Sequence, residues 1–179
     1  MKYFAYGANM FSPILAQVLP DITFAGIAKA KGYQLHFHKI GNQDESGKCN
    51  IVSVPDTACV IYGVLFDIPT RYRHVLDRAE RLGYGNQEVT LKVYPQGRLN
   101  GGCEDASGVF AFTYVAHQER VKDDLLPYTW YKNLVVNGAK EHDLPIEYIQ
   151  QLESYVAIND PNTARAQQFD AMVMAQPPV

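Results

Sequence analysis

The chain has 179 residues, of which 47% are hydrophobic and 20% are charged, so its composition is that of a globular protein. A chain of this length folds as one compact domain more readily than as two. Its 16 basic and 19 acidic residues give a net charge of −3, which argues against a broad nucleic-acid-binding surface. The longest apolar stretch, residues 58–66, is about half as long as a bilayer-spanning helix.

The cysteines and the N-terminal residues indicate a protein that folds and stays in the cytoplasm. Residues 1–9 contain no apolar run of signal-peptide length. The three cysteines are widely spaced and include no C-x-x-C pair, which predicts free thiols at Cys49, Cys59 and Cys103. A cysteine nucleophile assisted by a histidine is the alternative.

A short strand is predicted at residues 2–6, and it runs directly into a turn at Gly7. A serine followed by a proline then predicts a short helix over residues 12–18. Aromatic and β-branched residues, in places alternating with polar ones, predict further strands over residues 24–28, 33–38, 51–54, 59–66, 88–94 and 109–116. Polar residues and glycines predict loops over residues 41–48 and 96–108.

Helical periodicity begins in the middle of the chain, over residues 69–82, with Gly83 as the predicted stop. Two more helices are predicted over residues 128–137, ended by Gly138, and over residues 145–158. Strands outnumber helices, and most gaps between strands are too short for crossover helices. We therefore expect a single α+β domain with a mixed sheet that curls into a small barrel.

The turn Tyr6-Gly7-Ala8-Asn9 is the first candidate for chemistry, because it follows a strand and precedes a helix. Glycine permits a sharp turn, and successive free backbone N–H groups near a helix start bind carboxylate or phosphate. The sequence lacks the lysine of a P-loop and the glycine spacing of a dinucleotide site. An ordinary turn is the alternative interpretation.

Glu80 is the second candidate, because it lies one helical turn after Leu76 on the apolar face of the helix predicted over residues 69–82. Burial and the negative end of the helix dipole both disfavour an ionised carboxylate there, and a carboxyl tuned in this way suits a general base. The alternative is a boundary glutamate that reaches solvent past Leu82.

Other polar residues give weaker signals. His36 and His38 share one strand face and could bind a metal, but no third ligand is evident, and a hydrogen-bonded pair is the simpler interpretation. Tyr114 and Tyr131 are by default core residues whose hydroxyls find partners at the core edge.

Five segments, taken in chain order, resemble motifs of the γ-glutamylcyclotransferase family. They are residues 3–10 (YFAYGANM), 60–66 (VIYGVLF), 76–80 (LDRAE), 131–133 (YKN) and 137–148 (NGAKEHDLPIEY). Each motif alone is weak, but the ordered set covers most of residues 2–160. The resemblance implies one domain over residues 1–160, and the residues that end the chain predict a partly mobile C-terminal tail over residues 161–179.

This resemblance implies a barrel with helices packed around it and a cavity at one mouth. It implies release of 5-oxoproline from a γ-glutamyl amino acid or amide, with Glu80 as the catalytic acid/base and no metal or cofactor. The strand and turn at the start of the chain would hold the γ-glutamyl group, with two tyrosines nearby. The implied substrate-binding residues are Tyr3, Phe4, Ala5, Tyr6, Gly7, Ala8, Asn9, Tyr114 and Tyr131.

Two positions depart from the pattern of the family. Its turn usually reads Tyr-Gly-Ser-Asn, and Ala8 replaces the serine here, which keeps the backbone donors but removes a hydroxyl contact. Arg81 replaces the glycine that usually follows the glutamate, which adds a cation near the cavity and favours an anionic substrate.

The expected partner is a small γ-glutamyl compound rather than nucleic acid or a membrane, bound by a monomer or a homodimer. The leaving amine stays open, since an amino acid, an amine of a specific pathway and a lysine side chain all fit. Its pocket is expected in the loops 41–48 and 96–108. A non-catalytic binding module on the same fold is the alternative of a different class.

Overall fold

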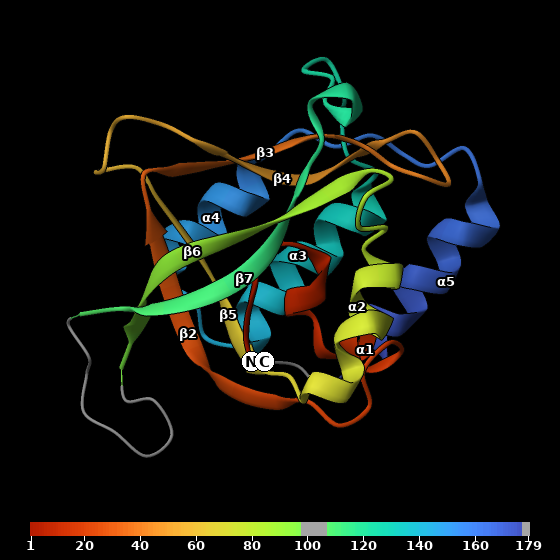
Figure 1. Cartoon of the computed structure of the whole chain (residues 1–179). Coiled ribbons are helices and arrows are strands. Elements are labelled where there is room, and N and C mark those ends of the chain that lie inside the picture. Colours follow the sequence, from red (N-terminus) through yellow and green to blue (C-terminus); the bar gives the residue numbers. More distant parts are fainter. Residues whose placement is uncertain (98–106, 177–179) are drawn as a thin grey trace.

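The computed structural model of the chain describes residues 1–97 and 107–176, and its centre is a closed five-stranded barrel (Figure 1). The barrel strands in spatial order are β1 (Lys2–Ala5), β5 (Val60–Asp67), β2 (Thr23–Lys31), β6 (Asn86–Gln96) and β7 (Val109–Ala116). β1 pairs antiparallel with β5 and parallel with β7, which closes the barrel. The predicted mixed sheet curled into a barrel is therefore confirmed.

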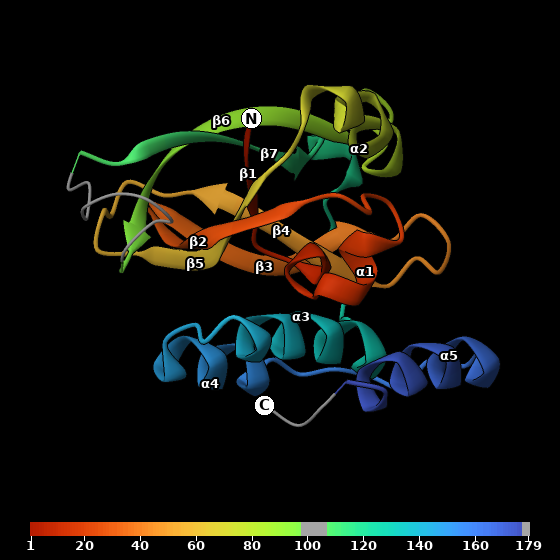
Figure 2. The ribbon, with the colours of Figure 1, turned by 90° about the horizontal axis from the view of Figure 1, so that it is seen from below.

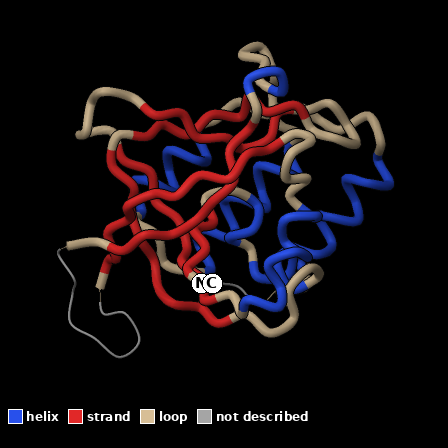
Figure 3. The backbone as a smooth tube through the Cα atoms, in the orientation of Figure 1, coloured by secondary structure: helices blue, strands red, loops and turns tan. Residues whose placement is uncertain are grey.

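Two further strands, β3 (Tyr33–Ile40) and β4 (Gly47–Ser53), form a separate antiparallel pair that lies across the top of the barrel in the view of Figures 1 and 3. Gly47 and Lys48 were expected in a loop but begin β4, because the Gly47 N–H donates to the Leu126 carbonyl (2.9 Å) and fixes the strand start. Most of the loop expected over residues 96–108, with Cys103, lies outside the described residues.

The helices are α1 (Ser12–Ala16), α2 (Arg73–Ala79), α3 (Thr129–Glu141), α4 (Ile146–Ser154) and α5 (Thr163–Met174), with 3₁₀ turns η1 (Ala8–Met10), η2 (Thr70–Tyr72) and η3 (Gln118–Arg120). Figure 2 shows α3, α4 and α5 as one layer on one side of the strands and α2 on the other side. In the described part of the chain, no helix has both the length and the apolar character that crossing a membrane requires.

Helix α3 continues through Gly138, so the prediction that this glycine ends the helix was wrong. A Cβ at Gly138 would lie 2.5 Å from the backbone nitrogen of Phe11 and 2.7 Å from the backbone carbon of Met10. The glycine is therefore needed for a close approach between two backbones and not for a left-handed stop. Through this contact α3 packs directly on η1.

The segment expected as a tail contains helix α5, for which the sequence pattern predicted no helix. Asn162 caps its start by accepting a hydrogen bond from the Arg165 N–H (3.0 Å). Phe169 stacks on Trp130 of α3 with 4.2 Å between ring centroids. No residue of α5 is fully buried, so the helix lacks the strong apolar periodicity that would predict it.

Asp160 ties α5 to α3 through a side chain with no solvent exposure. Its carboxylate accepts hydrogen bonds from Arg165 Nε (2.6 Å) and Nη2 (2.7 Å), from Trp130 Nε1 (2.7 Å) and from the Asn162 N–H (2.8 Å). The bonds from Arg165 make the largest contribution and lower the pKa of Asp160 to about 2.

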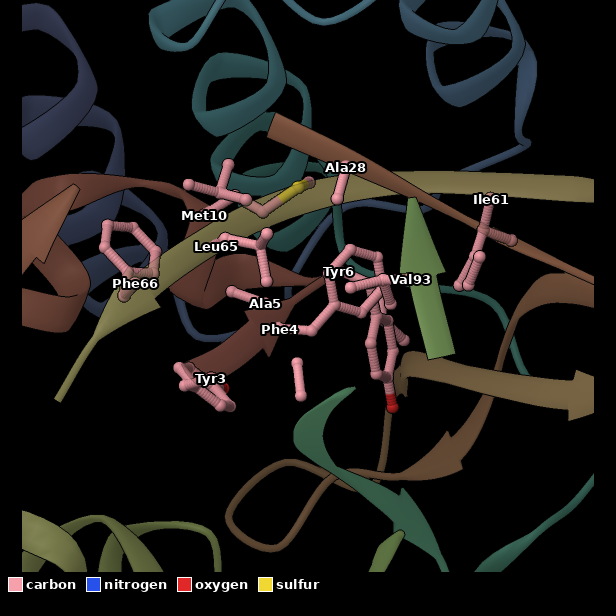
Figure 4. Close-up of a cluster of buried hydrophobic side chains, with 14 of the residues drawn as sticks. Tyr3, Phe4, Ala5, Tyr6, Met10, Ala28, Ile61, Leu65, Phe66 and Val93 are labelled. Atoms are coloured by element: carbon pink, nitrogen blue, oxygen red, sulfur yellow. The ribbon is translucent and has the colours of Figure 1, made fainter. Parts of the chain in front are cut away.

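The hydrophobic core fills the barrel and extends to the surrounding helices. Phe4 and Ala5 of β1 are 0% and 1% exposed and lie among Met10, Leu65 and Val93 (Figure 4). The strand that leads into the N-terminal turn is thus held on both faces, which gives the turn a rigid support.

Asp160→Asn should destabilise the fold by about 2–4 kcal/mol at neutral pH, because it breaks a buried ion pair and leaves Arg165 without a partner. Since the folded pKa of about 2 lies below the usual value of 3.8, the Asp160 contribution is complete above about pH 4 and is lost as the pH falls through 2. Urea unfolding of both proteins at pH 7, 4 and 2.5 measures this. A difference in unfolding free energy that stays constant down to pH 2.5 would contradict it.

Candidate active site

A cavity of about 330 Å³ lies where the turn after β1, the end of β3, the end of α2 and the start of α3 meet. Eight of the ten residues predicted for the site line it: Tyr3, Tyr6, Gly7, Ala8, Asn9, Glu80, Tyr114 and Tyr131. Residues 41–44 of the loop predicted to hold the leaving group also line the cavity. The fold thus brings the separate sequence motifs to one cavity.

Phe4 and Ala5 do not line this cavity, which corrects their prediction as substrate-binding residues. Both lie in the core of the barrel. The resemblance extended over the whole N-terminal segment, but Phe4 and Ala5 serve its packing. Their backbone pairs with β5, where Phe4 opposes Leu65 and Ala5 opposes Val64.

The Glu80 carboxylate is held by two asparagine side chains. Asn9 Nδ2 donates to Oε1 of Glu80 (2.7 Å), and Asn86 Nδ2 donates to Oε2 (3.2 Å). The same Asn9 amide also donates to the hydroxyl of Tyr3 (2.9 Å). Both carboxylate oxygens are therefore oriented from different elements, the turn after β1 and the start of β6.

Glu80 reaches this position because helix α2 ends immediately before it. Ala79 is the last residue of the helix, and Glu80 is its C-cap. Asn86 Nδ2 donates to the backbone carbonyl of Glu80 (2.6 Å), which satisfies one of the carbonyls left free at a helix end. The predicted apolar-face position of Glu80 thus becomes a half-buried position at the cavity wall.

The turn after β1 carries two backbone donors without a partner. Within residues 1–97 and 107–176, no hydrogen bond uses the backbone N–H of Ala8 or of Asn9. Both residues line the cavity. Their N–H groups are therefore available to a bound anion.

The C-terminal part of helix α3 holds the turn after β1 in place. His142 Nε2 donates to the Met10 carbonyl (2.9 Å), and Glu141 Oε2 accepts from the Ser12 N–H (3.0 Å). Gly138 adds the close backbone contact with Met10 and Phe11. Burial lowers the pKa of His142 below its usual value, which keeps the imidazole neutral as it donates to the carbonyl.

Four tyrosines line the cavity, and hydrogen bonds direct their hydroxyls differently. Tyr6 donates to the Tyr114 carbonyl (2.6 Å), while Tyr131 accepts from the Cys49 N–H (3.2 Å). The Tyr114 hydroxyl donates to Asp77, which lies outside the cavity lining. Burial raises the pKa of all four above the usual value of 10, so these hydroxyls stay protonated near neutral pH.

Cys49 lines the cavity, but burial raises the pKa of its thiol to about 12. A thiol with this pKa is almost entirely protonated at neutral pH, which argues against the alternative of a cysteine nucleophile at this position. Cys49 instead packs against the turn: a Cβ at Gly7 would lie 3.0 Å from its Cβ. Cys59 is half-buried and lies outside the cavity lining, and Cys103 is outside the described residues.

The histidine pair on β3 is a hydrogen-bonded structural feature. The rings of His36 and His38 stack with 4.9 Å between centroids. Asn50 Nδ2 donates to His38 Nε2 (3.0 Å), so Nδ1 carries the proton and donates to Asp123 (3.1 Å). Both nitrogens of His38 are thereby occupied, and the described residues contain no group of three or more metal-ligating side chains around it.

Comparisons with known proteins agree with this geometry. The sequence profile of the AIG2-like family matches residues 60–152, just over half of the chain. The chain belongs to the AIG2-like family. It is also similar to a γ-glutamylcyclotransferase of Bos taurus, with 23% identity over 154 residues that cover 85% of this chain and 77% of the bovine protein.

Solved structures show the same fold. One described as a γ-glutamyl cyclotransferase superposes with a TM-score of 0.83 at 22% identity, covering 98% of this chain and 99% of the other. A glutathione-specific γ-glutamyl cyclotransferase from yeast superposes with a TM-score of 0.52 at 11% identity, covering 97% of this chain and 95% of the yeast chain. The resemblance to γ-glutamylcyclotransferases is therefore confirmed for the family and the fold.

The two departures from the family pattern both lie at the cavity. Ala8 contributes its backbone N–H and has no hydroxyl to add. Arg81 has a φ of +52°, in the left-handed region where the usual glycine carries no strain and any other residue costs about 1 kcal/mol. The Arg81 side chain is exposed and lines the cavity, so it places a cation at the cavity rim.

Lys39, Asn86, Thr113 and Trp130 also line the cavity, and the sequence did not point to them, whereas Asp44 and Lys48 belong to the loop 41–48 that it did predict for the leaving group. Lys48 is paired with Asp44 (2.7 Å), and its ammonium lies 4.8 Å from the ring centroid of Trp130 and 4.6 Å from that of Tyr131. None of these residues belongs to a motif with a characteristic spacing. The only sequence feature that pointed toward this part of the cavity was the polar loop 41–48.

Gly138→Ala should destabilise the protein by about 2 kcal/mol or more, because the new methyl group would clash with the backbone of Phe11 and Met10. This is opposite in sign to the gain that alanine brings in an unconstrained helix. Urea unfolding measures the change, with Lys140→Ala as a control at a half-buried position of the same helix that loses only a solvent-accessible ion pair with Glu153, expected within about 0.5 kcal/mol of wild type. A Gly138→Ala protein as stable as wild type would show that α3 does not clamp the turn.

Proposed function

We propose that the protein is a γ-glutamyl cyclotransferase that converts a γ-glutamyl amino acid or amide into 5-oxoproline and a free amine, with Glu80 as the general acid/base. The observation that carries the proposal is the Glu80 carboxylate held by Asn9 and Asn86 at the wall of the cavity. A carboxylate oriented on both oxygens beside a turn with free N–H groups suits proton transfer on a bound, anionic substrate.

The substrate fits the cavity with its γ-glutamyl end at the N-terminal turn. Its α-carboxylate accepts from the N–H groups of Ala8 and Asn9, which have no other partner in the described residues. The α-ammonium, attached to the same carbon, then lies beside Glu80. Asn9 and Asn86 occupy two of the roughly four lone-pair sites of the Glu80 carboxylate, which leaves sites for the substrate ammonium.

The α-ammonium must lose one proton before its nitrogen can attack the γ-carbonyl. Glu80 accepts that proton, and the freed amine attacks the γ-carbonyl carbon, closing a five-membered ring. The amide C–N bond breaks as Glu80 delivers this proton to the departing nitrogen, and Glu80 then passes a second proton from the ring nitrogen to the released amine. Of the three ammonium protons, one stays on the ring nitrogen and two end on the leaving amine, which departs as an ammonium ion.

The comparisons support this class of reaction and leave the leaving group open. Relatives named γ-glutamyl cyclotransferases share the fold over nearly the whole chain, and one of them is named as specific to glutathione. An assay of 5-oxoproline release from γ-glutamyl amino acids, γ-glutamyl amines and γ-glutamyl-ε-lysine would identify the preferred leaving group. No release from any of these compounds by a folded sample would favour the binding-module alternative.

Glu80→Gln should lower kcat about 10²–10⁴-fold and leave the fold intact, because glutamine keeps the volume and the acceptor oxygen but cannot take a proton. Binding of a γ-glutamyl compound should persist, since the Ala8 and Asn9 donors are unchanged. Steady-state 5-oxoproline release, circular dichroism and calorimetric binding on the same preparation measure the three effects.

The matched control is Glu88→Gln, which makes the same chemical change on β6, outside the cavity, at a carboxylate paired with Arg73. This control should keep kcat within about twofold, as expected for a surface substitution. A Glu80→Gln protein with near-normal kcat would refute Glu80 as the acid/base. An equal loss in both variants would point to a general structural effect.

A further inference from the structure

Lys39 is a cationic side chain of the cavity with no partner among the residues that the structure describes. It lies near the end of β3, where its backbone pairs with Lys48 of β4, and it lines the cavity together with Glu80. Within residues 1–97 and 107–176, no carboxylate lies within 4 Å of its ammonium, and no side-chain hydrogen bond of Lys39 is formed. Burial lowers the pKa of Lys39, and the negative charge of Glu80 offsets this effect only in part.

The other lysine of the cavity is already neutralised. Lys48 donates to Asp44 (2.7 Å) and to the hydroxyl of Ser46 (2.6 Å). Among the charged residues of the cavity lining, this pair cancels, which leaves Lys39 and Arg81 against Glu80. The cavity therefore has an excess of positive charge, and it suits a ligand with a net negative charge.

A γ-glutamyl amino acid has such a charge, with two carboxylates and one ammonium. The two carboxylates lie on opposite sides of the amide bond that breaks. The one on the γ-glutamyl side is bonded to the carbon that carries the reacting amine, so it must lie near Glu80 and the turn at Ala8 and Asn9. The carboxylate on the leaving side needs a separate cation, and Lys39 comes from a different element that leads into the loop 41–44 of the cavity wall.

We propose that Lys39 is a specificity-determining residue that binds the carboxylate of the departing amino acid, so that the protein prefers γ-glutamyl amino acids to neutral γ-glutamyl amides. This inference rests on the proposed cyclotransferase function. It gives the half-buried, unpaired ammonium of Lys39 a partner that arrives only with the substrate. Arg81, exposed at the rim, can add long-range attraction but is not enclosed enough to select one group.

A competing role for Lys39 is to act on Glu80, whose negative charge favours the charged form of this lysine. The two roles predict that loss of Lys39 changes the kinetics of different sets of substrates. A cation that acts through Glu80 affects turnover of every γ-glutamyl compound. A cation that binds the leaving carboxylate affects only those that have one, and it changes KM rather than kcat.

The test compares γ-glutamylalanine with γ-glutamylalaninamide, which has the same shape but a neutral end. Wild type should have the lower KM for the acid, and Lys39→Met should raise that KM about 10–100-fold, as expected for the loss of one charge-assisted hydrogen bond. The KM for the amide should change less than about twofold, and kcat should be kept for both. Lys39→Arg, which keeps the charge, should keep the preference for the acid.

Lys122→Met is the matched control. Lys122 lies close to Lys39 in the fold, because the preceding residue, Val121, forms an isolated β-bridge with Lys39. The Lys122 side chain is 60% exposed and paired with Asp124, outside the cavity lining. This substitution should leave both KM values unchanged. Should Lys39→Met fail to fold by circular dichroism, Lys39→Gln replaces it.

Three results would overturn the proposal. They are a wild type without preference for the acid, an equal rise of KM for both compounds in Lys39→Met, and a fall in kcat at constant KM. Activity of wild type on both compounds without a preference overturns the role of Lys39 alone. No 5-oxoproline from either compound overturns the proposed function as well.

Discussion

The site depends on one amide group, the side-chain nitrogen of Asn9. Its two hydrogens are both used, one toward the Tyr3 hydroxyl (2.9 Å) and one toward the Glu80 carboxylate (2.7 Å). This group therefore joins β1 and the turn after it to the end of α2. Asn9 and Glu80, which it connects, are 71 residues apart along the chain. Any shift of the turn would change the position of the carboxylate, so the rest of the fold has to hold the turn.

Helix α3 does this from outside the barrel. Its glycine at position 138 lets the helix approach the backbone of Met10 and Phe11, and His142 holds the Met10 carbonyl. The buried bonds of Asp160 and the stacking of Phe169 on Trp130 attach α5 to α3 in turn. The helical layer of Figure 2 thus supports the Glu80 carboxylate indirectly, by holding the turn whose Asn9 donates to it.

Local pattern predicted most of the strands and the class of fold, because alternation and aromatic content report burial directly. It failed where a tertiary contact decides the structure. Gly138 reads as a helix stop, but the contact with Phe11 keeps it inside the helix. Helix α5 is held by one buried ion pair and one stacked ring, and neither produces an apolar period.

The site was predictable in part for the same reason. Glu80 and the Gly7–Asn9 turn lie in motifs with a recognisable order, so they could be predicted as site residues from the sequence. Asn86, which completes the hold on Glu80, and Lys39, which leaves the cavity with an unpaired cation, belong to no motif. Only the fold brings them together. Arg81 was predictable in part: its departure from the family pattern could be read from the sequence, but its left-handed backbone conformation could not.

The central claim is that the cavity cyclises its substrate and does not hydrolyse it. Uniformly ¹³C-labelled γ-glutamylalanine, followed by NMR with the wild-type protein, separates the two reactions, because cyclisation yields labelled 5-oxoproline and hydrolysis yields labelled glutamate. The account predicts that 5-oxoproline resonances grow in step with free alanine and that no glutamate forms. Glutamate as the product, or a substrate that binds and stays intact, would contradict it.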